Sequence, residues 1–541
     1  MTSTLTPYRP AGSPGRDGFA QILHAEWTKF RTINGWLIAV VAAAALTALL
    51  PIAIAGTAGN PVESCHAGNC QVEGSVVATG PGGEAVVDQF YFVHQAMEGN
   101  GSITALVTAP HGVAPKPHAP LDLRLPATQP WAKAGVMIKE STKAGSAYAA
   151  VALTGGHGVR MQYDYTHDIA GSDGKTTPLW LRLTRRGNVI TGYESAGGTH
   201  WSAIGTAVLP KLTTVVQAGL FVASPDYTEL ASGFGGGDDS NNGPTWSASS
   251  FTHVALTTGA AKWTGTAVAP PGDTQQNIIF PIGPHQQKCG VTGTCPGKQG
   301  FSQAGGSFRV TGSGDIAPFT PIVDPLQVCL FGVLFGLIAL IAIGVVYITA
   351  EYRRGMIRTT LTASPRRGRI LAAKAIVIGT VGFAAGLIGT VIAFIVVERK
   401  LNKLGWMPPV WHILSATSSI GLQVIIGTAA IVALTGVLAL AAGVITRRSA
   451  GAVAAVIGLV IVPLVLGIVL PLAPARLVLM ITPAAAFSVQ QIYPRYSQVS
   501  TTCAPYHGCF PLAPWTGFAV MCAWVAAALI TAAWLLRRRD A

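Results

Sequence analysis

Charged side chains are scarce in this chain of 541 residues: 11% of the residues are Asp, Glu, Lys or Arg, whereas 50% are hydrophobic. A typical soluble domain carries about 25% charged residues. The mean hydropathy of +0.45 also lies well above a soluble balance. This scarcity of charge excludes an ordinary soluble globular protein and indicates a membrane protein.

Ionisable side chains are absent from six long apolar runs. Each run is long enough to cross a bilayer, which takes about 20 residues. The predicted spans are 35–56, 326–350, 375–397, 421–445, 450–472 and 515–536. Transporters driven by protons or sodium ions usually keep ionisable groups at membrane depth. If this protein moves a substrate, we therefore expect the energy to come from another source.

Catalytic motifs are lacking as well. The sequence GSDGKTT at 171–177 ends like a phosphate-binding loop, but Ile169 stands where that loop needs its first glycine. The acids of the region 57–325 show no recurrent spacing of the kind expected for a glycoside hydrolase. Asp238 and Asp239, with two nearby asparagines, form a solvated turn more readily than a cation site. The chain is thus predicted not to be an enzyme and to bind no metal.

Cysteine is rare, with eight in the chain, and six of them form close pairs outside the predicted spans. The pairs are Cys65 with Cys70, Cys289 with Cys295, and Cys503 with Cys509. Thiols paired outside a membrane fit an oxidising surface, so these pairs predict disulfides, with a connectivity that the sequence does not fix. A metal site is the alternative for the first four, but none shows the two-residue spacing of zinc knuckles.

The basic residues of the short connecting segments predict the orientation of the spans. With both termini in the cytoplasm, 16 Lys or Arg residues lie inside and 5 lie in the short outside loops. Those inside are Arg9, Arg16, Lys29, Arg31, Arg353, Arg354, Arg358, Arg366, Arg367, Arg369, Lys374, Arg447, Arg448, Arg537, Arg538 and Arg539; those outside are Arg399, Lys400, Lys403, Arg476 and Arg495. Both termini are therefore predicted to be cytoplasmic, with residues 57–325 outside the cell.

The net charge of +13 belongs to the membrane part, because residues 57–325 hold 15 basic and 18 acidic residues. Nucleic-acid binding is therefore not implied.

Residues 1–16 are predicted to be a disordered leader and residues 17–34 an amphipathic helix on the inner leaflet, with apolar residues at helical spacing. The alternative for this helix is packing on a neighbouring domain. Residues 473–514 are predicted to hold a re-entrant or interfacial segment, and 537–541 a cytoplasmic tail.

Residues 57–325 form one large insertion that is rich in Gly, Thr and Ser. Its sequence pattern predicts an all-β domain. Apolar and polar residues alternate in LWLRLT, the turn RGN follows, and VITGYES resumes a strand. AYAAVAL, TGGHG and VRMQYDY give a second hairpin. These patterns favour an antiparallel sandwich over about 88–254. It resembles the concanavalin-like (jelly-roll) modules of bacterial surface proteins, in PWAKAGVMIKES, GVRMQYDY and LWLRLTRRGNVITGYESAGGTHWSAIG.

Residues 351–374, EYRRGMIRTTLTASPRRGRILAAK, join the second and third spans and hold seven cations against one acid, Glu351. Orientation of the spans and contact with anionic lipid account for the cations from Arg366 to Lys374. The remainder has the pattern of a short docking helix that Ser364 and Pro365 end. The candidate docking residues are Glu351, Arg353, Gly355, Ile357, Arg358, Thr359, Leu361 and Pro365.

This loop, HAEWTKFRT before the first span and the ending PWTGFAVMCAWVAAALITAAWLLRRRDA together resemble permease subunits of bacterial ATP-binding-cassette (ABC) exporters of the type-two family. The resemblance covers residues 17–56 and 326–541. In the loop it rests on Glu351, Gly355, Thr359, Leu361, Pro365, Arg366 and Lys374. The large exterior insertion departs from the family, because most such permeases have a short loop there.

The resemblance implies a multi-pass protein of the bacterial plasma membrane that works with a second permease copy, identical or related. It also implies cytoplasmic ATPase subunits, which bind ATP and magnesium and which the loop contacts, so that this chain holds no cofactor. The predicted function is export, driven by the separate ATPase. The alternative is a surface-sensing or glycan-binding membrane protein that uses the permease part as a scaffold, with aromatic residues such as Trp180 and Trp201 stacking on sugars.

Overall fold

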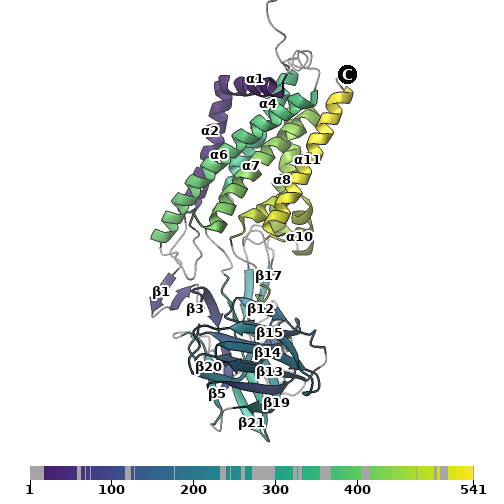
Figure 1. Cartoon of the computed structure of the whole chain (residues 1–541). Coiled ribbons are helices and arrows are strands. Elements are labelled where there is room, and N and C mark those ends of the chain that lie inside the picture. Colours follow the sequence, from purple (N-terminus) through teal and green to yellow (C-terminus); the bar gives the residue numbers. More distant parts are fainter. Residues whose placement is uncertain are drawn as a thin grey trace, which may run out of the picture.

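The computed structural model divides the chain into a helical bundle and a β-domain, which lies beyond one end of the bundle (Figure 1). The described residues are 18–57, 62–66, 69–72, 75–115, 124–126, 128–175, 177–231, 239–243, 245–257, 262–270, 299–320, 326, 330, 332–353, 367–404, 415–470, 472–492, 496–499 and 510–539.

Six helices of the described part are long and apolar enough to cross a membrane. The helical elements of the whole bundle, spans and shorter helices together, are α1 (Phe19–Thr32), α2 (Asn34–Ile54), α4 (Val333–Arg353), α6 (Arg367–Lys403), α7 (Ser419–Thr446), α8 (Ser449–Val460), α9 (Val462–Val469), α10 (Leu472–Ile481), the 3₁₀ helix η2 (Pro483–Gln490) and α11 (Pro514–Arg539). The candidate spans are α2, α4, α6, α7, the joined α8 and α9 up to Gly467, and α11. Each corresponds to one of the six predicted apolar runs.

The bounds of two spans differ from the prediction, one because charged residues extend its helix and the other because a proline follows a break in its helix. Helix α6 begins at Arg367 and ends at Lys403, well beyond the apolar run 375–397, because Lys and Arg are good helix formers and continue the helix at its ends. The fifth span is interrupted at Ile461, and Pro463 then stands in the first turn of α9. Proline suits that position because the backbone N–H it lacks would have no partner there.

Glycines at helix contacts bring the spans of this chain close together. A Cβ atom on Gly336 of α4 would overlap Thr47 of α2, and one on Gly332 would lie 2.6 Å from Pro51. On α6, a Cβ on Gly382 would lie 2.9 Å from Leu340, and one on Gly386 would lie 2.9 Å from Val432. These small residues therefore serve helix packing inside one subunit.

The β-domain contains two large antiparallel sheets and a smaller one. The seven-stranded sheet has the order β12 (His167–Ala170), β11 (Val159–Tyr163), β10 (Tyr148–Thr154), β9 (Lys133–Lys139), β16 (Val215–Ala223), β5 (Phe90–Glu98) and β20 (Thr264–Val268). The nine-stranded sheet has β15 (Ser202–Val208), β14 (Val189–Ser195), β13 (Leu179–Arg186), β6 (Gly101–Val107), β19 (Trp246–Leu256), β22 (Ser307–Gly312) and β21 (Gly300–Ala304), with β7 (His111–Pro115) and β8 (Arg124–Pro126) beside β19.

The small five-stranded sheet has the order β1 (Val62–His66), β2 (Asn69–Val72), β3 (Ser75–Thr79), β4 (Ala85–Asp88) and β23 (Ile316–Pro318). A separate pair consists of β17 (Tyr227–Ala231) and β18 (Asp239–Gly243). The backbone register of β1 and β2 sets Cys65 opposite Cys70, and the disulfide between them stays a prediction. The other two predicted pairs, Cys289 with Cys295 and Cys503 with Cys509, lie outside the described residues.

The two large sheets share one apolar core. Its side chains come from strands in which buried and partly exposed residues alternate. Leu181 and Leu183 of β13 are fully buried, whereas Trp180 and Arg182 between them stay partly exposed. Both predicted hairpins are present, as β10 with β11 and β13 with β14. The sheets extend beyond the predicted limits 88–254, because β20 pairs with β5 and β22 pairs with β19.

The β-domain contacts the bundle through the segment that precedes α11. The side-chain amide of Gln498 donates a hydrogen bond to the carbonyl oxygen of Tyr165 at 2.7 Å. The hydroxyl of Ser497 donates to Asp168 at 2.8 Å. The segment 496–499, which lies between η2 and α11 in the sequence, therefore contacts the turn after β11 and strand β12.

Candidate functional site

The candidate site lies at the end of the bundle away from the β-domain, where α1 crosses the spans and the C-terminus lies (Figure 1). We call it the basic end, because Arg353, Arg367, Arg447 and Arg537 are found there. The predicted docking residues Gly355, Ile357, Arg358, Thr359, Leu361 and Pro365 fall in 354–366, outside the described residues. Helices α4 and α6 carry the two ends of that loop, and Arg353, which is exposed, closes α4.

A fully buried lysine is the centre of the site. Lys374 of α6 has 0% exposed surface. Its ammonium nitrogen lies 2.7 Å from a carboxylate oxygen of Glu26 on α1 and 2.7 Å from one of Glu351 on α4. It also lies 4.7 Å from the ring centre of Tyr347, in a cation–π contact. One cation thus joins three helices.

The two carboxylates are held from further directions. The hydroxyl of Tyr347 donates to Glu26 at 3.0 Å, and Lys29 donates to the other oxygen of Glu26 at 2.8 Å. Lys29 also lies 3.7 Å from Glu351. The second oxygen of Glu351 is buried and has no hydrogen-bond partner among the described residues. The cluster therefore balances two acids with two bases and keeps one acceptor unsatisfied.

Aromatic side chains cover the cluster where α1 meets the spans. Phe30 stacks on Trp36 with ring centres 6.1 Å apart, and both rings meet Tyr347 edge-on at 5.7 and 5.6 Å. Such pairs add about 0.5–1.5 kcal/mol beyond area burial. The ion pairs of the fully buried Lys374 are kept from water, and a low local dielectric strengthens them.

The electrostatics of α1 follow from this environment. Burial by itself raises the pKa of Glu26, but the ammonium groups of Lys374 and Lys29 outweigh it and hold that pKa below its usual value. A carboxyl with a lowered pKa contributes stability above its unfolded pKa and loses that contribution as the pH falls through the folded one. The docking of α1 is therefore expected to weaken only in acid.

The cluster makes the two ends of the loop 354–366 mechanically dependent on α1. Glu351 lies three residues before the loop, and Lys374 lies eight residues after it. Arg367, the first residue of α6, also donates to the carbonyl oxygen of Leu536 at the end of α11. Any displacement of the loop ends must carry α1 along or break buried ion pairs, which costs several kcal/mol.

Two sequence-based interpretations change with this geometry. Lys374 was expected to orient the spans beside anionic lipid, but it is buried among carboxylates. Glu351 was expected to face a partner protein, but only 9% of its side chain is exposed and it pairs inside the chain. Sequence reasoning did not identify Glu26. The signal was present, because Glu26 lies on the apolar face of α1, four residues from both Ile22 and Phe30.

Six apolar helices that carry a cluster of this kind at one end define a multi-pass membrane protein. The family model described as ABC-2 family transporter protein matches residues 189–541, well over half of the chain. The chain belongs to that family and is a membrane permease of an ABC-type system.

Comparisons with individual proteins add little. No curated protein matches the chain. One solved structure, "The crystal structure of a functionally unknown protein from Saccharomyces cerevisiae", aligns with 38% of this chain and 94% of its own, at 13% identity and a TM-score of 0.19. A likeness this weak supports no conclusion about fold or function.

Proposed function

We propose that this chain is the permease subunit of an exporter driven by separate cytoplasmic ATPase subunits, with two permease copies enclosing the substrate path. Lys374 carries the proposal, because it ties both ends of the loop 354–366 to α1 through Glu26 and Glu351. A subunit that hydrolyses ATP must move the spans from outside the membrane. A loop whose two ends are locked to one interfacial helix suits that task.

Orientation supports the same proposal. The basic end holds the excess of Lys and Arg that cytoplasmic segments carry. With this end in the cytoplasm, the β-domain stands outside the cell and the loop 354–366 faces the ATPase. The ATP and magnesium then belong to the partner, and the chain itself supplies the path and its coupling to hydrolysis.

The docking part of the loop gives the test. We expect Leu361→Asp to leave membrane insertion intact but to weaken ATPase association and to abolish coupled ATP hydrolysis, because a charge cannot enter an apolar groove without a partner. Co-purification of the ATPase and its hydrolysis rate measure both effects. Leu361→Met, which keeps an apolar side chain of similar volume, is the matched control and should behave as wild type.

The proposal would be contradicted if the Leu361→Asp variant bound the ATPase and coupled normally, while changing the arginines at 366, 367 and 369 inverted the topology. The loop would then serve only to orient the spans.

A second candidate, recognition of a surface glycan, rests on the outer face of the nine-stranded sheet. The Arg182 guanidinium lies 3.7 Å from the ring centre of Trp201, and Trp180 lies beside His253. The rings of Trp180 and Trp201 are partly exposed, as sugar-stacking rings are. The two functions are compatible in one chain, since the faces that carry them lie at opposite ends of it.

A further inference from the structure

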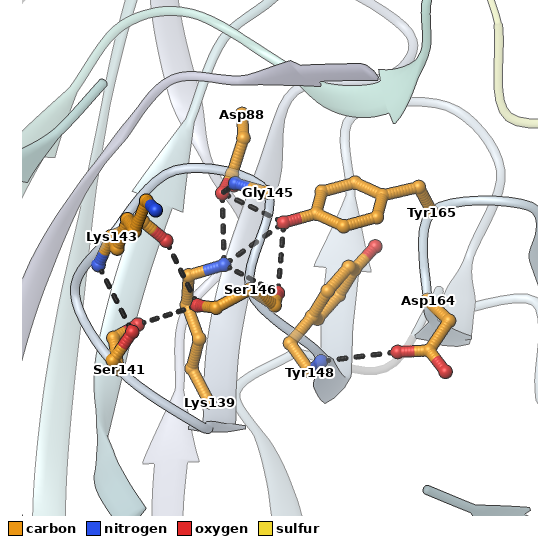
Figure 2. Close-up of polar contacts among 9 residues, drawn as sticks. All are labelled: Asp88, Lys139, Ser141, Lys143, Gly145, Ser146, Tyr148, Asp164 and Tyr165. Carbon is orange, nitrogen blue, oxygen red and sulfur yellow. Dashed lines mark hydrogen bonds and ion pairs between the residues drawn. The ribbon is translucent and has the colours of Figure 1, made fainter. Parts of the chain in front are cut away.

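A buried amine and a buried carboxyl meet in the β-domain, between β4 of the small sheet and β9 of the seven-stranded sheet (Figure 2). Asp88 ends β4 and Lys139 ends β9, and both side chains have 0% exposed surface. The Lys139 nitrogen donates to Asp88 Oδ2 at 2.8 Å. The surroundings are apolar and aromatic, with Phe90, Phe92, Tyr148, Tyr165 and Phe221 among the buried cluster.

A tyrosine hydroxyl bridges the pair. Lys139 donates to the hydroxyl of Tyr165 at 2.9 Å, and this hydroxyl donates to Asp88 Oδ2 at 2.7 Å (Figure 2). The backbone N–H of Gly145 donates to the same oxygen at 2.8 Å, and the carbonyl oxygen of Ser146 accepts from Lys139 at 2.9 Å. Asp88 Oδ1 is buried without a hydrogen-bond partner among the described residues.

Burial works against the charged forms of Lys139 and Tyr165. Burial lowers the pKa of the Lys139 ammonium in spite of the neighbouring Asp88 carboxylate. Burial likewise raises the pKa of the Tyr165 hydroxyl, which therefore keeps its proton. An isolated ion pair in such a site costs several kcal/mol of desolvation per ion. A proton transfer from Lys139 to Asp88 would leave an amine, which is a nucleophile, and a carboxyl with a hydroxyl that can leave as water.

We propose that Lys139 and Asp88 react with each other to form an isopeptide bond between β9 and β4. The Lys139 nitrogen bonds to Cγ of Asp88, the bond from Cγ to Oδ2 breaks, and one water leaves. The Lys139 ammonium passes one proton to Oδ2 through the Tyr165 hydroxyl, which receives one proton as it gives another, and this frees the amine. A second proton follows the same route as the bond from Cγ to Oδ2 breaks, so that the ammonium and the carboxylate give one amide and one water. Oδ1 remains as the amide oxygen. The reaction needs no oxidant, cofactor or second substrate.

Positioning accounts for the expected reactivity. Fixed groups at contact distance act at effective concentrations far above those in solution, and about 7–11 kcal/mol of a barrier can be removed in this way. The backbone of Tyr165 has a φ of 60° and that of Asp164 a φ of 42°, so this turn is held in a conformation that residues other than glycine rarely adopt. The turn directs the Tyr165 hydroxyl at the pair.

The same strand provides an internal comparison. Lys133, at the other end of β9, lies 2.8 Å from Asp315, but Asp315 is 16% exposed. Lys133 also donates to the carbonyl oxygen of Ile316, and the backbone N–H of Ile316 donates to Asp315. No tyrosine hydroxyl bridges this pair among the described residues. Water and the lack of a proton relay should keep Lys133 and Asp315 as an ion pair.

The position of the bond suggests its use. Strands β4 and β23 are neighbours in the small sheet, and the chain leaves the bundle shortly before this sheet and returns to it soon after β23. A covalent bond from β4 to β9 would fasten that sheet to the body of the β-domain. Force between the membrane and an exterior ligand would then pass through a covalent link rather than an ion pair.

Peptide mapping of the full chain, purified in detergent and digested with a protease that cuts after Lys and Arg, tests the proposal. We expect a branched peptide that contains Asp88 and Lys139, weighs one water less than its two parts, and is uncut after Lys139. Lys133→Arg should give the same branched peptide. Asp88→Ala should give none, and Tyr165→Phe should lower its yield severalfold.

The digest of the wild-type chain alone shows whether the bond between Lys139 and Asp88 forms. Recovery of Asp88 and Lys139 only in linear peptides, with normal cleavage after Lys139, would mean that the pair is ionic and would overturn the proposal. A branched peptide through Lys133 instead would overturn it as well.

Discussion

Replacing Lys374 by methionine should destabilise the bundle by about 3–5 kcal/mol, because Glu26 and Glu351 would then lie buried without the cation that joins them. Lys29→Met is the matched control. The Lys29 side chain is 44% exposed, so its ion pairs are partly screened and its loss should cost no more than about 1 kcal/mol. Unfolding of the detergent-solubilised chain, followed by circular dichroism, measures the difference between the two variants.

Removing the charges together should reverse most of this loss. A triple variant, Lys374→Met with Glu26→Gln and Glu351→Gln, leaves no uncompensated buried charge, and such replacements are often neutral. We therefore expect it to unfold near the wild type. A Lys374→Met single variant as stable as wild type would contradict the cluster as a stabilising centre.

The second large effect concerns the contact between α4 and α7. A Cβ atom on Gly344 would lie 2.5 Å from the carbonyl oxygen of Gly436 and 3.1 Å from Cβ of Ala439. Both neighbours belong to α7, and a backbone oxygen cannot move unless the helix moves. Gly344→Val should therefore separate the two helices and cost about 3 kcal/mol, at the upper end of the usual overpacking penalty.

Gly458 of α8 supplies the control, because nothing lies within 4 Å of a Cβ atom built there. Gly458→Val makes the same chemical change in a span without the clash. We expect its thermal unfolding in detergent to stay near that of wild type while Gly344→Val unfolds at a clearly lower temperature. Equal midpoints for the two variants would contradict the close approach of α4 and α7.

Much of this architecture was predictable because lipid and sheet geometry impose simple patterns on sequence. A bilayer needs about 20 apolar residues per helix, so all six spans were identifiable from their runs. Strands buried on one face alternate, as in β13, so its hairpin was identifiable too. The strands beyond residue 254 were missed, since β22 pairs with β19 across more than fifty residues and no local pattern records such a partner.

The candidate site was predictable only in part. Its loop has a local signature, but the pair between Glu26 and Lys374 joins residues 348 positions apart. An acid on the apolar face of α1 and a lysine in the buried row of α6, between Leu371 and Val377, were the available signals. Each of these two residues, considered alone, is a charged side chain on an otherwise apolar helix face. Only the fold shows that the two charges pair with each other.

The most direct test of the account asks what the loop 354–366 touches. A photo-reactive residue in place of Leu361 should, in native membranes, form an adduct with a chain that contains a phosphate-binding loop. The same residue in place of Trp515, which is 62% exposed at the start of α11, should form no such adduct, because it lies at the opposite end of the span. An ATPase that co-purifies with the chain but forms no adduct at position 361 would contradict coupling through this loop.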